Sequence, residues 1–243
     1  QTYSVNALPA LAGGSGTISA TQASGAAYPS SIYTNVEEFL ISASELASIG
    51  FAGVTSASSL ADAYKAAGYS VGYSSAAGAY WVYEPADASD GPGHFGWHTA
   101  WGDEPTNLPT TGIAQYNFVG GTNPTDNFGR VGSFSSGNMT VNFGAQTISN
   151  NSAMTMSFGS GGGQTPTTYQ FAANQTWALG VGAQAASVSC TVGCMGSSYG
   201  WVNGRFVGSG GTGFVASVAV SNTMLNATYQ SHAAGAVAVF AKQ

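Results

Sequence analysis

Apolar and polar residues alternate along most of the second half of the chain, with the period of two that a β-strand requires. Met139, Val141 and Phe143, for example, are separated by Thr140 and Asn142. Because successive side chains of a strand point to opposite faces, the apolar set is expected in a core and the polar set in water. Eight strands are predicted from such patterns and from the turn residues between them, at about Gly112–Val119, Asn138–Gly144, Ala153–Phe158, Thr167–Ala173, Trp177–Val181, Ser197–Val207, Gly213–Ser221 and Ala233–Ala241.

Three closely spaced stretches near the C-terminus are expected to close a β-barrel. They are Gly200–Gly208, Phe214–Val220 and Gly235–Phe240, and each is rich in apolar residues. Charged side chains on an exposed edge strand usually prevent it from pairing with another chain, and this chain has few charged residues. Either the sheet closes on itself, or an edge pairs with another molecule.

Earlier in the chain, Tyr80–Tyr83 and His94–Trp101 are rich in aromatic residues and are predicted to be strands. Asp87–Gly93 contains Asp, Ser, Gly and Pro and is predicted to be a loop, and Asp103–Thr111 is predicted to be a Pro-containing connection. The glycine-rich run at 159–163 lacks the lysine of a phosphate-binding loop and is predicted to be a hairpin turn.

A helix is predicted from about residue 36 to residue 49. Thr34 and Glu37 fit a capping box, and Gly50 follows as a stop. Apolar residues recur at helical spacing at Phe39, Leu40, Leu46 and Ile49.

A second, shorter helix is predicted at about residues 60–67. Ser58 or Ser59 is the expected cap, and Gly68 the expected terminator. The fold class expected is therefore mainly β, an eight-stranded antiparallel up-and-down barrel with a small N-terminal part that contains one or two short helices. We divide the chain into an N-terminal arm and helical segment at 1–85 and a barrel at 86–243.

The chain is almost devoid of charge, which excludes some classes of partner. Only 6% of its 243 residues are charged, and its net charge is −6. Nucleic acid requires clustered basic residues, and the chain has four basic residues in total. No apolar run reaches the ~18 residues of a membrane helix, so the chain is not expected to span a membrane through a helix. With 44% hydrophobic residues the chain has enough core to fold without a cofactor, and none is expected.

Cys190 and Cys194 are separated by three residues and are expected to form a disulfide that clasps a tight turn. A redox or metal pair is the alternative, although no third ligand lies nearby in the sequence. The chain starts at Gln1 without Met, which we interpret as a processed N-terminus. Together these features predict a location outside the cytoplasm, secreted, at the cell surface or in a periplasm.

Several stretches resemble transferrin-binding-protein-B-like barrel domains, a fold that also ends FecR-type secreted proteins of Gram-negative bacteria. Trp97–Tyr116 resembles the "W-x-W…P-x-x-G-x-A-x-Y" start of that barrel, and Met139–Ile148 resembles its "L-x-V-x-F-x-x-x-x-I" hairpin. Gly204–Gly208 and Gly235–Phe240 match its closing "G-x-F-x-G…G-x-x-x-F". The resemblance covers about residues 94–241. It implies an eight-stranded barrel used as a surface-exposed binding or scaffold module, without catalytic residues. Transferrin binding itself does not carry over.

The candidate binding residues lie in and after the strand at 94–101. His94 and His98 would share one face of that strand about 13 Å apart, too far for one metal ion. Trp97 and Trp101 would form a pair on the opposite face. Aromatic packing with hydrogen-bonded imidazoles is the main interpretation, and a haem or metal site is the alternative.

Asp103 and Glu104 follow directly, with Asp87 and Asp90 upstream. Loop carboxylates can bind calcium, but the EF-hand spacing is absent, so a solvated loop is the main interpretation. No Gly-x-Ser-x-Gly motif stands between a strand and a helix, so an enzyme is not expected.

Two functions fit these observations. The first is a secreted, non-catalytic barrel that binds a protein or a small ligand. The second is a structural subunit that assembles with copies of itself into a fibre, sheath or surface layer, through a polar arm at residues 1–33 that adds a strand to a neighbour.

Overall fold

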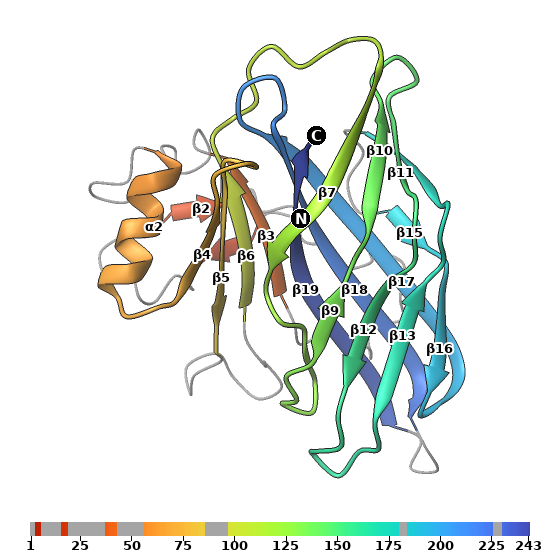
Figure 1. Cartoon of the computed structure of the whole chain (residues 1–243). Helices are drawn as coiled ribbons and strands as arrows, with labels where there is room; N and C mark the ends of the chain where they lie inside the picture. The colour runs from red at the N-terminus through yellow and green to blue at the C-terminus, as the bar shows by residue number, and fades with distance from the viewer. Residues whose placement is uncertain are drawn as a thin grey trace.

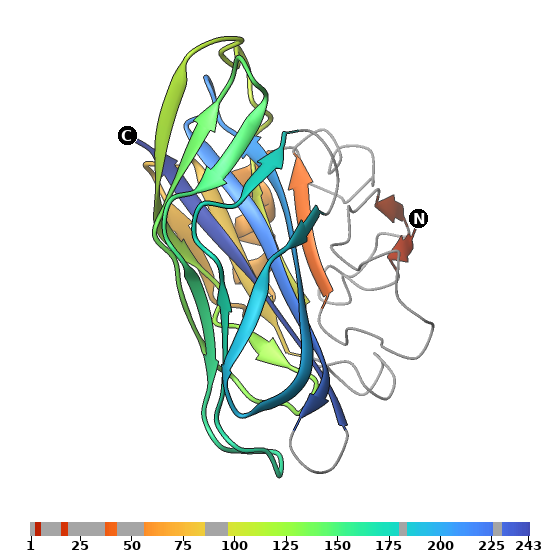
Figure 2. The same ribbon diagram turned by 90° about the vertical axis from the view of Figure 1, so that its right-hand side faces the viewer.

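A barrel of antiparallel strands makes up most of the computed structural model, and a small sheet with one helix packs against its side (Figure 1). The structure describes residues 3–5, 16–18, 37–42, 56–85, 97–179, 184–225 and 230–243. Turned by 90°, the molecule shows the long C-terminal strands, in blue, running nearly the full height of the barrel (Figure 2).

The barrel strands follow one another along the chain. They are β7 (Ile113–Gly121), β8 (Thr125–Asp126), β9 (Ser133–Ser135), β10 (Asn138–Asn142), β11 (Thr147–Asn150), β12 (Met154–Phe158), β13 (Thr167–Phe171), β14 (Thr176–Ala178), β15 (Gln184–Ala186), β16 (Val188–Val192), β17 (Cys194–Val207), β18 (Gly213–Leu225) and β19 (Gln230–Lys242).

Four of the barrel strands are long strands interrupted near the middle. The pairs β9 and β10, β11 and β12, β13 and β14, and β15 and β16 each continue one another along the chain. Counted this way, with β7, β17, β18 and β19, the described part forms a nearly closed eight-stranded barrel in up-and-down order. β19 pairs with β7 and brings the last strand back to the first. The predicted fold class is confirmed.

The barrel core contains the apolar residues that the alternation assigns to the inside. Met139, Val141 and Phe143 point inward from β10 and the turn after it, while Thr140 and Asn142 are half-buried on the other face. The same holds for the apolar positions of β12 and for Phe214, Ala216, Val218 and Val220 of β18. The hairpin predicted over Met139–Ile148 is formed by β10 and β11, in which Val141 pairs with Ile148.

The outer face of β18 and β19 is buried as well, and the expectation of one wet face is wrong for these strands. Val215, Val237 and Val239 point away from the barrel core and pack against Ala79 and Ala100 of the small sheet. The reason is that a second layer of strands covers them. Two buried faces require apolar residues at successive positions, and this matches the near-continuous Ala and Val of β19.

The small sheet has the strand order β3-β6-β5-β4. Its members are β3 (Glu37–Ser42), β4 (Val71–Ser74), β5 (Ala79–Glu84) and β6 (Trp97–Gly102), and a separate two-stranded sheet is formed by β1 (Tyr3–Val5) and β2 (Gly16–Ile18). Trp81 of β5 lies so close to the barrel that a Cβ added to Gly120 of β7 would come within 2.5 Å of its ring. Close packing of this kind explains why the two layers meet at glycine and alanine.

The helix predicted over residues 36–49 is wrong where the structure describes it. Residues 37–42 form β3, which pairs in parallel with β6 over six residues, from Glu37 with Trp97 to Ser42 with Gly102. The backbone ladder to β6 supplies hydrogen-bond partners that local spacing cannot reveal, so tertiary pairing overrides helix propensity. Thr34 and residues 43–49 lie outside the described residues.

The second predicted helix is confirmed as α2 (Ala57–Ala66). Its cap is Ser56, not Ser58 or Ser59, and Ser59 bonds back to the backbone of Ser56 in a capping box. Gly68 ends the helix with a φ of +91°, a conformation that favours glycine.

The transition from the small sheet to the barrel lies between β6 and β7. β6 pairs with β3 and β5 of the small sheet, although it lies after residue 85, where we predicted that the N-terminal part ends. The division of the chain at residues 85 and 86 stays a prediction.

Within the described ranges, no helix has the length and apolarity needed to cross a membrane. Cys190 and Cys194 form a disulfide across the turn between β16 and β17, with Cα atoms 5.9 Å apart. A disulfide is compatible with an extracellular or periplasmic location.

Candidate functional site

The predicted binding residues on β6 divide between its two faces as the alternation requires. Trp97 and Trp101 face α2, and His98 faces the barrel. His94 lies outside the described residues, as do Asp87 and Asp90. The residues that the sequence grouped into one site therefore serve two separate packing layers.

Trp101 is fully buried and ties the helix to the small sheet. Its indole Nε1 donates a hydrogen bond of 2.9 Å to the carbonyl oxygen of Ala57 at the start of α2. Its ring stacks on Tyr80 at 5.6 Å between centroids and packs on Tyr64 at 5.4 Å. Trp97 is half-buried beside the same cluster. This is the aromatic packing that the sequence favoured over a ligand site.

The aromatic cluster reaches the surface at Tyr73. The ring of Tyr73 stacks on Tyr80 at 4.4 Å between centroids, and 53% of Tyr73 is exposed. Burial raises the pKa of Tyr80, helped by the nearby phenol of Tyr73 and the carboxylate of Asp103. The phenol of Tyr80 therefore stays neutral under ordinary conditions.

Asp103 acts at the N-terminus of α2, although the residue itself is exposed. Its Oδ1 accepts a hydrogen bond of 3.2 Å from the backbone N–H of Ala57, where a negative charge favours the helix. Glu104 is exposed in the loop that follows. Among the described residues, no three His, Cys, Asp or Glu side chains gather closely enough to hold a metal ion.

His98 is fully buried with both ring nitrogens in hydrogen bonds. Nδ1 lies 2.7 Å from the hydroxyl of Thr122, and Nε2 lies 2.8 Å from the hydroxyl of Thr125. Burial lowers the pKa of His98 to about 3, so the ring is neutral at physiological pH. A neutral imidazole donates through one nitrogen and accepts through the other, and two hydroxyls satisfy both. His98 thus joins the small sheet to the barrel and has no nitrogen left for a metal or haem.

Sequence reasoning missed a buried polar cluster beside the hairpin between β12 and β13. The cluster is formed by Asp126 of β8, Arg130 of the following loop, Tyr169 of β13 and His232 of β19. Oδ2 of Asp126 accepts from Nε of Arg130 at 2.6 Å and lies 2.9 Å from Nε2 of His232. The hydroxyl of Tyr169 bonds to Nδ1 of His232. All four residues are buried.

Hydrogen bonds decide the charge of this cluster. Burial by itself would raise the pKa of Asp126, but hydrogen bonds from His232 and Arg130 outweigh it and lower that pKa. Burial lowers the pKa of His232, and the charge of Arg130 lowers it further, although the carboxylate of Asp126 raises it. Burial also raises the pKa of Tyr169. The result is a buried Asp126–Arg130 ion pair beside a neutral histidine that donates to the aspartate and accepts from the tyrosine.

The Tyr169–His232–Asp126 chain has the order of a nucleophile, a base and an orienting carboxylate, but these side chains are closed off from any substrate. The cluster instead holds the end of the barrel. Nη1 of Arg130 donates to the carbonyl oxygens of Gly159 and Thr165, at 3.0 and 2.8 Å, and so fixes the glycine-rich hairpin between β12 and β13. One feature of the sequence could have revealed this cluster. Asp126 and Arg130 lie four residues apart in a chain that has few other charged residues.

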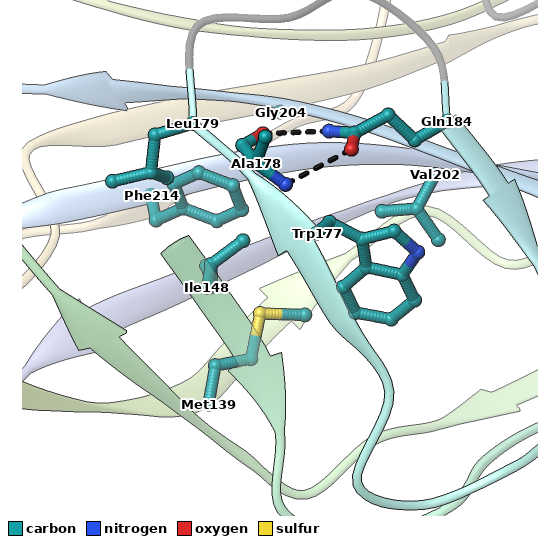
Figure 3. A pocket seen from close by; sticks show the side chains of 9 residues that line it. All are labelled: Met139, Ile148, Trp177, Ala178, Leu179, Gln184, Val202, Gly204 and Phe214. Carbon is teal, nitrogen blue, oxygen red and sulfur yellow. Dashed lines mark hydrogen bonds between the residues drawn. The ribbon is translucent and has the colours of Figure 1, made fainter. Parts of the chain in front are cut away.

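Among the described strands, β14 and β15 share no backbone ladder, and neither do β16 and β17. We call the gap between β14 and β15 the seam. A cavity of about 20 Å³ lies under it, with the side chains shown in Figure 3. The cavity is lined by Met139, Ile148, Trp177, Ala178, Leu179, Gln184, Val202, Gly204 and Phe214. Its floor is apolar, and the amide of Gln184 lies over it between the two strands (Figure 3).

Compared with known proteins, the chain matches no family model and no curated sequence.

Proposed function

We propose that this chain is a secreted, non-catalytic binding module whose barrel is a filled scaffold and whose partner is a protein that docks on the outer surface. The observation that carries this proposal is the filled interior, which Phe, Tyr, Trp and Met side chains occupy from all sides. The cavity of about 20 Å³ has room for about one water molecule. Pockets for small ligands are on the order of 300–1,000 Å³.

The proposed docking surface is the loop of residues 103–112, together with Ile113 at the start of β7. Two backbone hydrogen bonds hold this loop, from Gly208 N–H to Asp103 O at 2.9 Å and from Gly210 N–H to Thr106 O at 2.6 Å. Leu108 is 37% exposed and Ile113 is 67% exposed. A loop already fixed in place loses little freedom on binding, which favours affinity.

The charge of this surface favours a basic partner. Asp103 and Glu104 are exposed in the same loop, and the whole chain carries a net charge of −6. Complementary charge increases the rate of encounter and helps to select the partner. The resemblance to transferrin-binding-protein-B-like barrels supports the same class of function, since the eight-stranded up-and-down barrel is the fold that it implies.

Capture with matched variants tests this proposal. The full chain is immobilised, incubated with host extracellular fluid, and the retained proteins are identified by mass spectrometry. Ile113→Asp is compared with Val131→Asp, because both residues are exposed aliphatics, at 67% and 61%, and Val131 lies outside the proposed surface, between β8 and β9. We expect a protein that the wild type and Val131→Asp retain and that Ile113→Asp loses.

Two results would contradict the proposal. One is retention of the same proteins by both variants, which would place the docking surface elsewhere. The other is saturable haem binding by the purified chain with an increase in its melting temperature, which would favour a small ligand over a protein.

A second candidate function is a structural subunit that assembles with copies of itself. A different observation supports it, namely the missing backbone ladder between β14 and β15. Unpaired strand edges favour the addition of a further strand.

A further inference from the structure

The barrel closes its seam with side chains. Up to Ala172, whose N–H donates to the carbonyl oxygen of Ser187 at 3.0 Å, the neighbouring strands are joined by backbone hydrogen bonds. Beyond that point the seam is bridged by Gln175, Trp177 and Gln184, each bonded to backbone groups of the opposite side. The indole of Trp177 donates to the carbonyl oxygen of Ala185 at 3.1 Å.

Each glutamine imitates a peptide group. Oε1 of Gln184 accepts from the N–H of Ala178 at 2.9 Å, and its Nε2 donates to the carbonyl oxygen of Ala178 at 2.6 Å (Figure 3). Gln175 does the same with Ser187, accepting from its N–H and donating to its carbonyl oxygen at 3.1 Å. A carboxamide offers one acceptor and one donor side, as a peptide unit does. The two glutamines therefore occupy the places that the backbone of an additional strand would take.

The backbone groups at the seam are turned toward such a strand. Ala178 pairs with Thr147 of β11, but its own N–H and carbonyl oxygen point across the seam to Gln184. Residues 172–179 and 184–187 contain no charged residue, although edges are usually protected by charge. At this seam the strand edges are covered instead by the neutral side chains of Gln175 and Gln184, and the latter lies over the apolar residues that line the cavity.

The N-terminal arm of the chain matches this acceptor. Residues 1–33 contain no charged residue, so an uncharged segment would meet an uncharged seam. β1 has three residues, the same length as β14 and as β15. Among the described strands β1 pairs only with β2, and an isolated two-stranded ribbon is marginally stable. β2 lies on the α2 side of the molecule, while β15 lies beside β17 on the far side (Figure 1).

We propose that β1 of one copy of this chain inserts between β14 and β15 of a second copy and displaces the side chains of Gln175 and Gln184. The proposal rests on the second candidate function and names its contact. Because donor and acceptor are different surfaces of the molecule, the contact is heterologous and the assembly runs head to tail. Insertion of a strand needs roughly 9.6 Å between β14 and β15, twice the ordinary strand spacing.

Two proline variants of the full chain separate donor from acceptor. Ala178→Pro removes the N–H that faces the seam and takes no donor from the pairing with β11. Ser4→Pro removes a donor from the centre of β1. The matched controls are Ala178→Ser and Ser4→Ala, which keep both N–H groups. Mass is measured by light scattering during gel filtration, over a range of protein concentrations.

The wild type and both controls are expected to form oligomers that lengthen with concentration, while each proline variant alone stays at 24.4 kDa. An equal mixture of the two proline variants is expected to stop at a dimer, since one contributes only a donor and the other only an acceptor. Two results would show that the seam is not the contact, although the chain still assembles. One is a mixture of the two proline variants that stays monomeric, and the other is an Ala178→Pro chain that assembles like Ala178→Ser. A wild type that stays monomeric at every concentration overturns self-assembly as well.

Hydrogen–deuterium exchange on the unmodified chain gives a test that does not depend on the folding of a proline variant. The amides of residues 176–178 and 184–187 are expected to gain protection as protein concentration increases, and those of α2 are not. Equal exchange at low and high concentration in an assembling sample contradicts the proposal.

Discussion

Replacement of Asp126 by Asn tests whether the buried ion pair holds the end of the barrel. Asn has the same shape, and its Oδ1 can still accept from the N–H groups of Phe128 and Arg130, at 3.0 and 2.8 Å in the wild type. The local loop is therefore preserved. The change removes the negative charge that lies 2.6 Å from Nε of Arg130 and the acceptor that lies 2.9 Å from Nε2 of His232.

The expected loss of stability follows from burial. The side chains of Arg130 and Asp126 are 5% and 0% exposed, so water screens neither charge. Removing one partner of a buried pair leaves the other charge without compensation and costs about 3–5 kcal/mol. That is a large share of the ~5–15 kcal/mol that stabilises a typical domain. For a chain of this size, a loss of that magnitude lowers the melting temperature by roughly 6–20 °C.

The matched control is Asp62→Asn. Asp62 also pairs with a basic residue close in sequence, at 3.5 Å from Lys65, but these side chains are 76% and 55% exposed. Exposed pairs contribute roughly 0–1 kcal/mol, so this variant should unfold almost like the wild type. Free energies of unfolding are measured by urea titration at pH 7. If Asp126→Asn loses no more than Asp62→Asn, the buried pair does not stabilise the barrel, and the reasoning is refuted.

The pH dependence gives an independent check on the same variant. The folded-state pKa of Asp126 lies below its ordinary value of 3.8, so the carboxylate contributes stability above that pH and loses it as pH falls through the folded pKa. The difference between the wild type and Asp126→Asn should therefore narrow as pH falls below about 3.8.

Two further predictions concern His98 and the disulfide. Burial lowers the pKa of His98 from 6.5 to about 3, so stability is complete above pH 6.5 and falls with decreasing pH toward 3, by about 1.4 kcal/mol per pH unit. His98→Gln should reduce this slope in urea titrations between pH 7 and pH 5, most strongly toward pH 5, where the unfolded chain binds the full proton. Parallel profiles would argue against a neutral buried ring. Reduction of Cys190–Cys194 should cost about 2 kcal/mol, because the loop that it closes is short, and lower the melting temperature by roughly 4–8 °C. A Cys190→Ser, Cys194→Ser chain should melt at the same temperature with and without the reductant, and any response in it would point to another target.

The alternation of side chains predicted correctly which residues face the barrel core. Met139 and Val141 of β10 and Phe214 of β18 lie inside because the two faces of a strand are fixed by its own geometry. The short helix and its glycine terminator were readable for the same reason, since capping and chain reversal depend on residues a few positions apart. The sequence placed the cap itself two or three residues too late.

The candidate site was predicted less well than the fold. His98 was correctly separated from Trp97 and Trp101, but its partners Thr122 and Thr125 lie 24 and 27 residues away. The Asp126–His232 hydrogen bond joins residues 106 positions apart. No local pattern contains such pairs, because they form only when the barrel brings its first and last strands together.

The sequence by itself determined most of the strands and their inward faces, since these depend on periodicity and on turns between neighbours. It missed the strand formed by β15 and β16, and it counted Trp177–Val181 as a strand of its own although β14 continues β13. Only the tertiary structure decided that residues 37–42 form a strand, because their partner β6 lies sixty residues further along the chain. It also decided that the outer face of β19 is covered and that the barrel ends in a seam held by Gln175 and Gln184. The physical reason is the same throughout: local patterns fix how a segment can pair and bury its faces, whereas distant segments decide what it pairs with.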